Sequence, residues 1–201
     1  MLAGISPKPH VALTYDDGPD PRSTPCFLNV LAQHDRTATF FLLGEHVEKN
    51  HNLVKDMVDS GHELGVHGWN HQCLATKRPG TLHDELRRTK HLLEDLSGAP
   101  VRWYRPPYGV LTGEGLLATG ATELRTVLWT SWGRDWTSVA TRDSIARTVT
   151  RDLRPGGTVL LHDTDRTAAP GCWKRTLAAS ELLLEHWARH DFRVGPLRDH
   201  W

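Results

Sequence analysis

Two adjacent acidic residues, Asp16 and Asp17, follow a short β-type run and precede a sharp Gly18-Pro19 turn. Where a strand gives way to a turn, both carboxylates can reach one site, one as a metal ligand and the other beside it as a general base. A solvated turn in which Asp20 caps the next helix explains the same residues equally well. Taken alone, this block is consistent with a reactive site or with an ordinary turn.

A second block, His62–His71, contains two histidines, His67 and His71, four positions apart. If the chain enters a helical turn after His67, both imidazoles lie on one side and can bind one divalent ion. A pair at this spacing is usually incidental, but this pair also follows a predicted strand. Asp17, His67 and His71 would supply the three protein ligands typical of a catalytic zinc site with a position open for water. The same ligands would accept Co, Mn or Ni.

Three further blocks of polar and aromatic residues also follow predicted strands. In the first, Arg105 precedes two prolines and Tyr108. Because prolines fix the backbone, the Tyr108 N–H would be held in place and could stabilise an oxyanion. The other two blocks are Ser131–Trp136 and Thr158–Asp163. Each block has an ordinary explanation as a rigid turn, a packing loop or a helix cap, but the carboxyl ends of barrel strands face one mouth, so five such blocks are expected to converge.

Short β-type runs alternate with helical segments along the chain, a pattern typical of β–α units around a largely parallel sheet. The predicted strands are His10–Tyr15, Thr37–Leu43, Glu63–Val66, Arg102–Tyr104, Leu124–Trp129, Thr158–Leu161 and Phe192–Val194. The predicted helices are Thr24–His34, Glu45–Ser60, Leu82–Leu96, Gly113–Thr119, Ser144–Leu153 and Lys174–His190. The fold class is therefore α/β, a distorted (β/α) barrel of about seven parallel strands. No repeat or long linker interrupts residues 1–201, which are expected to form one domain.

Composition narrows the classes of partner and compartment. With 24 Lys plus Arg and 24 Asp plus Glu, the chain has no net field to attract nucleic acid or an anionic membrane, so a neutral or weakly charged substrate is expected. The first residues lack the features of a secretory leader, which predicts a cytoplasmic protein unless a leader was removed. Three cysteines, an odd count, argue against a disulfide framework. A bridge between Cys73 and Cys172 stays open, as does the oligomeric state.

The five blocks resemble, in order, the five motifs of the polysaccharide deacetylase family, the NodB-homology domain of carbohydrate esterase family 4. The matching segments are Thr14–Pro19, His67–His71, Arg105–Gly109, Asp135-Trp136 and Leu160–Asp163. The resemblance implies a NodB-like barrel and covers most of the chain.

The resemblance also implies catalytic roles. Asp16 would be the general base, and His162 the general acid. Asp17, His67 and His71 would hold one divalent ion, for which zinc is the first expectation.

Other residues are implied to support this chemistry. Arg105 would position the base, and Asp135 would bond to the acid and raise its pKa. Tyr108 would offer its backbone N–H to the oxyanion. Trp136 and Leu160 would wall the pocket for the acetyl methyl group, and Pro107 would also contact the substrate.

The implied activity is removal of the N-acetyl group from an acetylated carbohydrate or a sugar-bearing metabolite, with release of acetate. An O-deacetylase of the acetylxylan esterase type and a catalytically silent carbohydrate-binding domain are the alternatives. One position departs from the family pattern: the second motif usually has Ser or Thr after its first histidine, and here that residue is Gly68. The missing hydroxyl would ordinarily brace the loop, so metal affinity or loop order is expected to differ.

Overall fold

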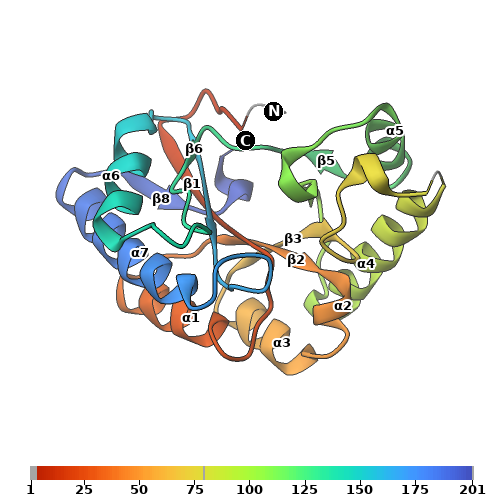
Figure 1. Ribbon diagram of the computed structural model, residues 1–201, viewed down its shortest axis with the longest axis horizontal. Coiled ribbons are helices and arrows are strands. Elements are labelled where there is room, and N and C mark those ends of the chain that lie inside the picture. The colour runs from red at the N-terminus through yellow and green to blue at the C-terminus, as the bar shows by residue number, and fades with distance from the viewer. Residues whose placement is uncertain (1–3, 79, 201) are drawn as a thin grey trace.

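A curled, parallel β-sheet surrounded by helices forms the body of the protein in a computed structural model, which describes residues 4–78 and 80–200 (Figure 1). The strands of the described chain are β1 (His10–Asp16), β2 (Thr39–Leu43), β3 (Glu63–Gly68), β4 (Trp103–Tyr104), β5 (Arg125–Thr126), β6 (Ser131–Trp132), β7 (Thr158–His162) and β8 (Arg193–Gly195). Residues 1–3, at the start of the segment that lacks leader features, lie outside the described part.

The strand order confirms the predicted α/β barrel class and shows how the barrel is distorted. The sheet runs β5-β4-β3-β2-β1-β7-β6, and β8 pairs with β1 beside this path. All strand pairs among the described residues are parallel. Because the chain alternates between strands and helices, the carboxyl ends of the strands share one edge of the sheet.

The helices lie on the outer face of the sheet (Figure 1). Those of the described chain are α1 (Thr24–Gln33), α2 (Gly44–Val47), α3 (His51–Asp59), α4 (Thr81–Ser97), α5 (Gly113–Ala121), α6 (Arg142–Asp152) and α7 (Cys172–Arg189), with 3-10 turns η1 (Leu74–Thr76), η2 (Pro107–Gly109) and η3 (Leu197–Asp199). Among these helices, none combines the length and the apolar composition needed to cross a membrane.

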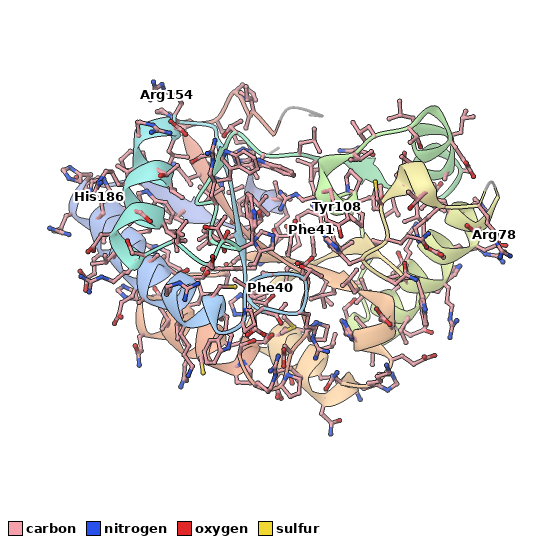
Figure 2. The ribbon with its side chains drawn as sticks, viewed as in Figure 1. Phe40, Phe41, Arg78, Tyr108, Arg154 and His186 are labelled. Carbon is pink, nitrogen blue, oxygen red and sulfur yellow. The ribbon has the colours of Figure 1, made fainter. Side chains whose placement is uncertain are left out.

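Two successive residues of β2 belong to different apolar layers, one on each face of the sheet. Phe40 belongs to the large cluster between the sheet and the helices, and Phe41 belongs to a small inner cluster (Figure 2). Side chains of a strand alternate between its two faces, so a continuous apolar run can serve both layers. Leu197 of η3 also belongs to the inner cluster and has an N–H that donates to Thr39 Oγ1 at 2.8 Å. The inner layer is therefore filled by side chains and is not a channel.

The strand predicted over Leu124–Trp129 is wrong in its extent, because this region contains only the short β5 and the chain next pairs at β6. These two strands lie at opposite ends of the strand order. Between them, the carbonyls of Val127 and Leu128 accept from the Arg105 guanidinium, at 3.4 Å to Nε and 3.1 Å to Nη2. A buried cation thus takes acceptors that a neighbouring strand would otherwise use, and the barrel is left unclosed here.

The single helix predicted over Glu45–Ser60 is also wrong, because the chain forms α2 and α3 with a break at Asn50. The Asn50 side-chain amide donates to the His46 carbonyl at 2.8 Å, and the Asn50 backbone N–H donates to Val47. In a continuous helix, the His46 carbonyl would accept from the backbone N–H of Asn50. Asparagine side chains compete in this way with helical hydrogen bonds, which explains the break.

The cysteines form no bridge in the described chain. Cys26, Cys73 and Cys172 are all free, so the alternative of a Cys73–Cys172 disulfide is not realised. Burial raises the pKa of Cys172 to about 11, as expected for an inert thiol packed at the start of α7.

Candidate active site

The sequence blocks meet at the carboxyl edge of the sheet, around a cavity of about 210 Å³. Asp16 and His162, the last residues of β1 and β7, are partners in the register of these strands. His67 is the penultimate residue of β3, and His71 follows four positions later. The residues lining the cavity are Asp16, His67, His71, Pro106, Tyr108, Gly109, Trp129, Trp132, Trp136, Leu160, His162 and Thr167.

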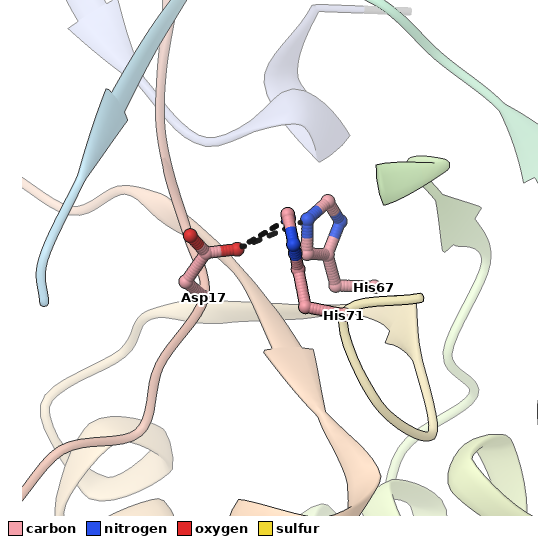
Figure 3. A group of neighbouring side chains, drawn as sticks. All are labelled: Asp17, His67 and His71. Atoms are coloured by element: carbon pink, nitrogen blue, oxygen red, sulfur yellow. Dashed lines mark ion pairs between the residues drawn. The ribbon is translucent and has the colours of Figure 1, made fainter. Parts of the chain in front are cut away.

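Asp17 faces both histidines of the second block across the mouth of the barrel (Figure 3). Its Oδ1 lies 3.2 Å from His67 Nε2 and 3.2 Å from His71 Nε2. Adjacent residues of a regular strand point to opposite faces, but Asp17 has a φ of 78°, so the chain turns here. This turn allows Asp16 and Asp17 to approach the same site. The structure therefore brings together the three residues predicted as metal ligands.

The chemistry of this group fits a divalent cation. His67 Nδ1 lies 2.7 Å from the carbonyl oxygen of Arg105, to which an Nδ1–H donates, and this tautomer leaves the Nε2 lone pair facing Asp17. Within the described part of the chain, Asp17 Oδ1 is buried without a hydrogen-bond donor. A cation between these acceptors would satisfy all of them, and one ligand atom from each of Asp17, His67 and His71 lies within 4.8 Å of the others.

The charge states of the group also suit a metal. Burial opposes ionisation of Asp17, but His67, His162 and His71 outweigh it and lower the pKa of this carboxyl well below its ordinary value. Burial lowers the pKa of His71 to about 4, against the opposing effect of Asp17. At neutral pH the group thus contains an anionic carboxylate and a neutral His71, the forms in which these side chains bind metals.

Arg105 holds Asp16 beside the metal-ligand group. Its Nη1 donates to Asp16 Oδ1 at 2.7 Å and to Thr14 Oγ1 at 2.7 Å. The guanidinium is fully buried over the Phe41 ring, 4.2 Å from the ring centroid. Asp16 Oδ2 remains on the side of His67, 3.9 Å from Nε2. One carboxylate oxygen is therefore fixed, and the other faces the site.

His162 and Asp135 form a second carboxylate–imidazole pair. Asp135 Oδ1 lies 3.0 Å from His162 Nδ1, and Asp135 Oδ2 accepts from the backbone N–H of His162 at 2.8 Å. Thr176 of α7 donates to the same Oδ2 at 3.1 Å. Burial opposes the charged imidazolium, but Asp135 overrides it and raises the pKa of His162 to about 10. The raised pKa favours the protonated imidazole at neutral pH, the form that a general acid needs.

The walls of the cavity are more aromatic than the sequence predicted. Trp129, Trp132 and Trp136 follow one another, with ring centroids 5.7 Å and 5.1 Å apart. Only Trp136 was predicted, because tryptophans in a loop give no sequence signal that separates packing from substrate contact. Thr167, a loop residue with no motif around it, was missed entirely.

The third motif differs from its prediction in one residue. Pro106 lines the cavity, whereas Pro107 is buried and is not among the described lining residues. Tyr108 has a φ of 59° and lies with its ring edge against His71, 4.4 Å between centroids. This backbone turn leaves Tyr108 63% exposed, whereas the Pro107 side chain beside it is buried. The residue types alone do not indicate which of the two prolines faces the cavity.

Gly68 has a backbone conformation that explains its lack of a side chain. Its φ is 109°, and an added Cβ would lie 3.3 Å from the Asn70 carbonyl oxygen. The loop that carries the histidines is braced from outside itself. The Glu45 N–H donates to the Trp69 carbonyl at 2.9 Å, and Arg88 of α4 stacks over the Trp69 ring at 3.5 Å. Packing on α2 and α4 thus holds a loop that lacks the usual hydroxyl.

A group of residues that could hold a metal ion, with a neighbouring carboxylate and imidazole at the mouth of a (β/α) barrel, is the arrangement typical of metal-assisted hydrolases. The chain belongs to the polysaccharide deacetylase family, whose family model matches residues 3–127. This membership confirms the resemblance drawn from the five sequence motifs.

Individual comparisons support the family assignment. The chain is 35% identical over 198 residues to a chitooligosaccharide deacetylase of Bradyrhizobium sp. (strain ANU 289), covering 93% of this chain and 88% of the relative. It is similar to a crystal structure of the Bc1960 peptidoglycan N-acetylglucosamine deacetylase, with a TM-score of 0.89, 31% identity and coverage of 100% and 91%. It is also similar to a CE4 family pseudoenzyme from Bacillus anthracis, with a TM-score of 0.85, 28% identity and coverage of 96% and 66%.

Proposed function

We propose that the protein is a metal-dependent deacetylase that hydrolyses the N-acetyl group of an N-acetylated sugar, oligosaccharide or polysaccharide and releases acetate. One observation carries the proposal. His67 and His71 of the metal-competent group, which Asp17 completes from beside the cavity, line the same cavity as a held carboxylate, Asp16, and an imidazole with a raised pKa, His162. The named activities of the similar proteins, chitooligosaccharide and peptidoglycan N-acetylglucosamine deacetylation, support the same substrate class.

The residues of the site divide the reaction between them. When bound at this group, a divalent ion would lower the pKa of a water toward about 7 and polarise the acetyl carbonyl. Asp16, held by Arg105, accepts the proton of the attacking water. The Tyr108 backbone N–H donates to the developing oxyanion, where one such donor contributes about 2.7 to 4 kcal/mol. His162 donates its proton to the departing nitrogen, which is needed because an amide anion is a poor leaving group.

Zinc is the proposed ion, because two imidazoles and one carboxylate with room for water form a common catalytic zinc set. Cobalt, manganese and nickel accept the same ligands. Elemental analysis of the purified protein, followed by reconstitution of the metal-free protein with each ion in turn, would identify the ion that restores acetate release.

The decisive experiment measures acetate release from metal-loaded protein on four substrates: chitin oligomers, peptidoglycan fragments, small N-acetyl sugars and acetylated xylan. Release from at least one N-acetylated substrate, faster than from acetylated xylan, is expected. Faster release from acetylated xylan would overturn the proposed N-deacetylation and establish the O-deacetylase alternative. Boiled protein and the metal-free protein serve as controls in the same assay.

The similarity to a pseudoenzyme makes a silent carbohydrate-binding domain the alternative from another class. In this chain, the candidate base, the candidate acid and the candidate metal ligands are all present, and all of them except Asp17 line one cavity. Carbohydrate binding without acetate release by the metal-loaded protein, across all four substrates, would contradict the proposed catalysis.

A further inference from the structure

The loop between β7 and α7, residues 163–171, is joined residue by residue to the segment that follows β1, residues 17–24. Five consecutive residues of the loop each contact this segment through a side chain. In chain order the pairs are Asp163 Oδ2 with Thr24 Oγ1, Thr164 Oγ1 with Asp20 Oδ2 at 2.9 Å, Asp165 Oδ1 with Arg22 Nη2 at 2.9 Å, Arg166 Nε with Asp20 Oδ2 at 3.3 Å, and Thr167 Oγ1 with Asp17 Oδ2. The turn that carries Asp17 is therefore held along its length by these five contacts, which together are called the clamp.

The loop is also held by hydrogen bonds between its own residues and by one to Trp136. Asp165 Oδ2 accepts from the Gly171 N–H at 2.6 Å, and the Ala168 N–H donates to the Asp165 carbonyl at 3.2 Å. The Ala169 N–H donates to the Trp136 carbonyl at 3.0 Å. Asp20, which receives two of the cross-loop contacts, is 1% exposed. Thr167 is thus presented to Asp17 from a loop held at both sides.

The position of the Thr167 contact separates the two oxygens of Asp17. Thr167 donates to Oδ2, while Oδ1 is the oxygen 3.2 Å from His67 Nε2 and His71 Nε2. A carboxylate with two free oxygens can rotate or bind an ion through both, whereas a hydrogen bond to one oxygen orients the other. Nothing in the proposed reaction uses the Thr167 hydroxyl directly.

We propose that Thr167 is a positioning residue of the metal site, which fixes Asp17 so that Oδ1 alone faces the ion. The inference rests on the proposed function for the metal group and adds a specific hydroxyl, and the loop 163–171 that presents it. Hydrogen bonds to metal-ligating carboxylates contribute to affinity, with losses of about 10-fold to 100-fold when such outer partners are removed.

The test measures the Zn²⁺ dissociation constant of the metal-free protein by competition with a chromophoric chelator. Thr167→Val removes the hydroxyl at nearly constant size and is expected to weaken Zn²⁺ binding by about 10-fold or more. Thr167→Ser retains the hydroxyl and is expected to bind within a few-fold of the wild type. Thr150→Val, an exposed site on α6, is the matched control and should bind Zn²⁺ as the wild type does.

A second variant tests whether the loop contacts act through Thr167. Arg22→Gln breaks the ion pairs with Asp20 and Asp165 without touching Asp17. It is expected to weaken Zn²⁺ binding less than Thr167→Val does. The double variant should bind no more weakly than Thr167→Val alone, because both changes then remove the same restraint. Independent, additive losses would overturn the role of the clamp.

The outcomes separate this inference from the proposed function. If the wild type binds Zn²⁺ stoichiometrically and Thr167→Val binds it equally tightly, Thr167 has no positioning role, and the deacetylase proposal is unaffected. If the wild type binds no divalent ion, the metal-dependent function itself fails. The visible spectrum of Co²⁺-substituted protein gives a further readout, since a changed carboxylate geometry in Thr167→Val, and not in Thr167→Ser, should alter it.

Discussion

Two histidines that line the cavity, His71 and His162, each lie beside a carboxylate, yet they differ in charge state. His71 lies 3.2 Å from Asp17, yet burial dominates and lowers its pKa to about 4. The His162 side chain is 13% exposed, as is that of His71, yet Asp135 reaches both its Nδ1 and its backbone N–H and raises its pKa to about 10. The number and geometry of the carboxylate contacts decide which effect wins.

This difference suits the two ends of the cavity to different tasks. A neutral imidazole offers a lone pair to a metal ion, whereas an imidazolium offers a proton to a leaving group. Residues of the same type, placed on the same edge of one sheet, thereby acquire complementary roles. The predictions below remove or alter one end at a time.

The largest effect is expected from removing the carboxylate of the metal end. Asp17→Ala should lose stoichiometric metal, because two imidazoles alone leave the ion without its anionic ligand. Acetate release should fall by about a thousandfold or more, since a metal ion contributes several kcal/mol to such reactions. Elemental analysis is the primary measurement, with Asp59→Ala, an exposed site on α3, as the control. Full metal content in Asp17→Ala would remove Asp17 from the ligand set.

Removing the imidazolium of the other end should separate chemistry from metal binding. His162→Ala is expected to lower the rate on an N-acetyl substrate by about 10²-fold to 10⁴-fold and to leave metal content unchanged. An ester substrate should lose less, because an alkoxide needs less help to depart. His190→Ala, an exposed histidine after α7, is the matched control. Unchanged turnover in His162→Ala would exclude it as the acid.

Weakening the contact between Asp135 and His162 should lower the pKa of His162 and make this histidine neutral above pH 7, as His71 is. Asp135→Asn removes the largest of the charges that raise the pKa of His162 to about 10, while burial still lowers it, so this pKa should fall to near 6.5. The wild-type His162 is protonated at pH 8, whereas that of the variant is largely neutral. At pH 8 this alone should cost about 30-fold in rate, and the loss should shrink as the pH falls below 6.5. A pH–rate profile, with imidazole NMR titration, measures it, and a loss that is constant with pH would contradict this account.

The raised pKa of His162 also makes the stability of the fold depend on pH. A folded-state pKa above the ordinary value stabilises the fold fully below about pH 6.5 and progressively less as the pH rises through 10. The wild type should lose this contribution over that window, and Asp135→Asn should not. Chemical denaturation of both proteins across the window tests the difference.

The smallest effect concerns the backbone of the metal end. Gly68→Ser places a side chain at a φ of 109°, close to the Asn70 carbonyl, and should lower the free energy of unfolding by about 1 to 3 kcal/mol. Gly120→Ser in α5 is the control, since no atom lies within 4 Å of an added Cβ and its φ is not positive. The control should be neutral or slightly stabilising. Equal stability of both variants would show that Gly68 is unstrained by a side chain.

Local patterns were sufficient to predict the elements that carry the site. Strands at His10–Tyr15 and Thr158–Leu161 were predicted within one residue of β1 and β7, because each is a short apolar run next to a glycine–proline turn signal, the pattern of a buried strand. The errors at Glu45–Ser60 and Leu124–Trp129 have another origin. A side-chain amide and a distant guanidinium take backbone acceptors there, and neither competitor is visible in the periodicity.

The site residues also divide into those that local sequence patterns predicted and those that only long-range contacts define. Asp16, Asp17, His67, His71 and His162 were identified by type and by position after strands, and the structure places all five around one cavity or at its edge. Trp129, Trp132 and Thr167 were not, because a loop residue acquires a role only from what lies opposite it. The organisation of residues 1–201 as one domain stays a prediction.

The sequence by itself determined the α/β class, the family and the set of reactive side chains, since these depend on residue type and short-range spacing. The tertiary structure alone decided which oxygen of Asp17 faces the two histidines and which residue holds the other oxygen. The physical reason is that the orientation of a carboxylate depends on partners that can lie far along the chain, such as Thr167, 150 residues from Asp17. Such distances along the chain leave no local pattern from which the contact could be read.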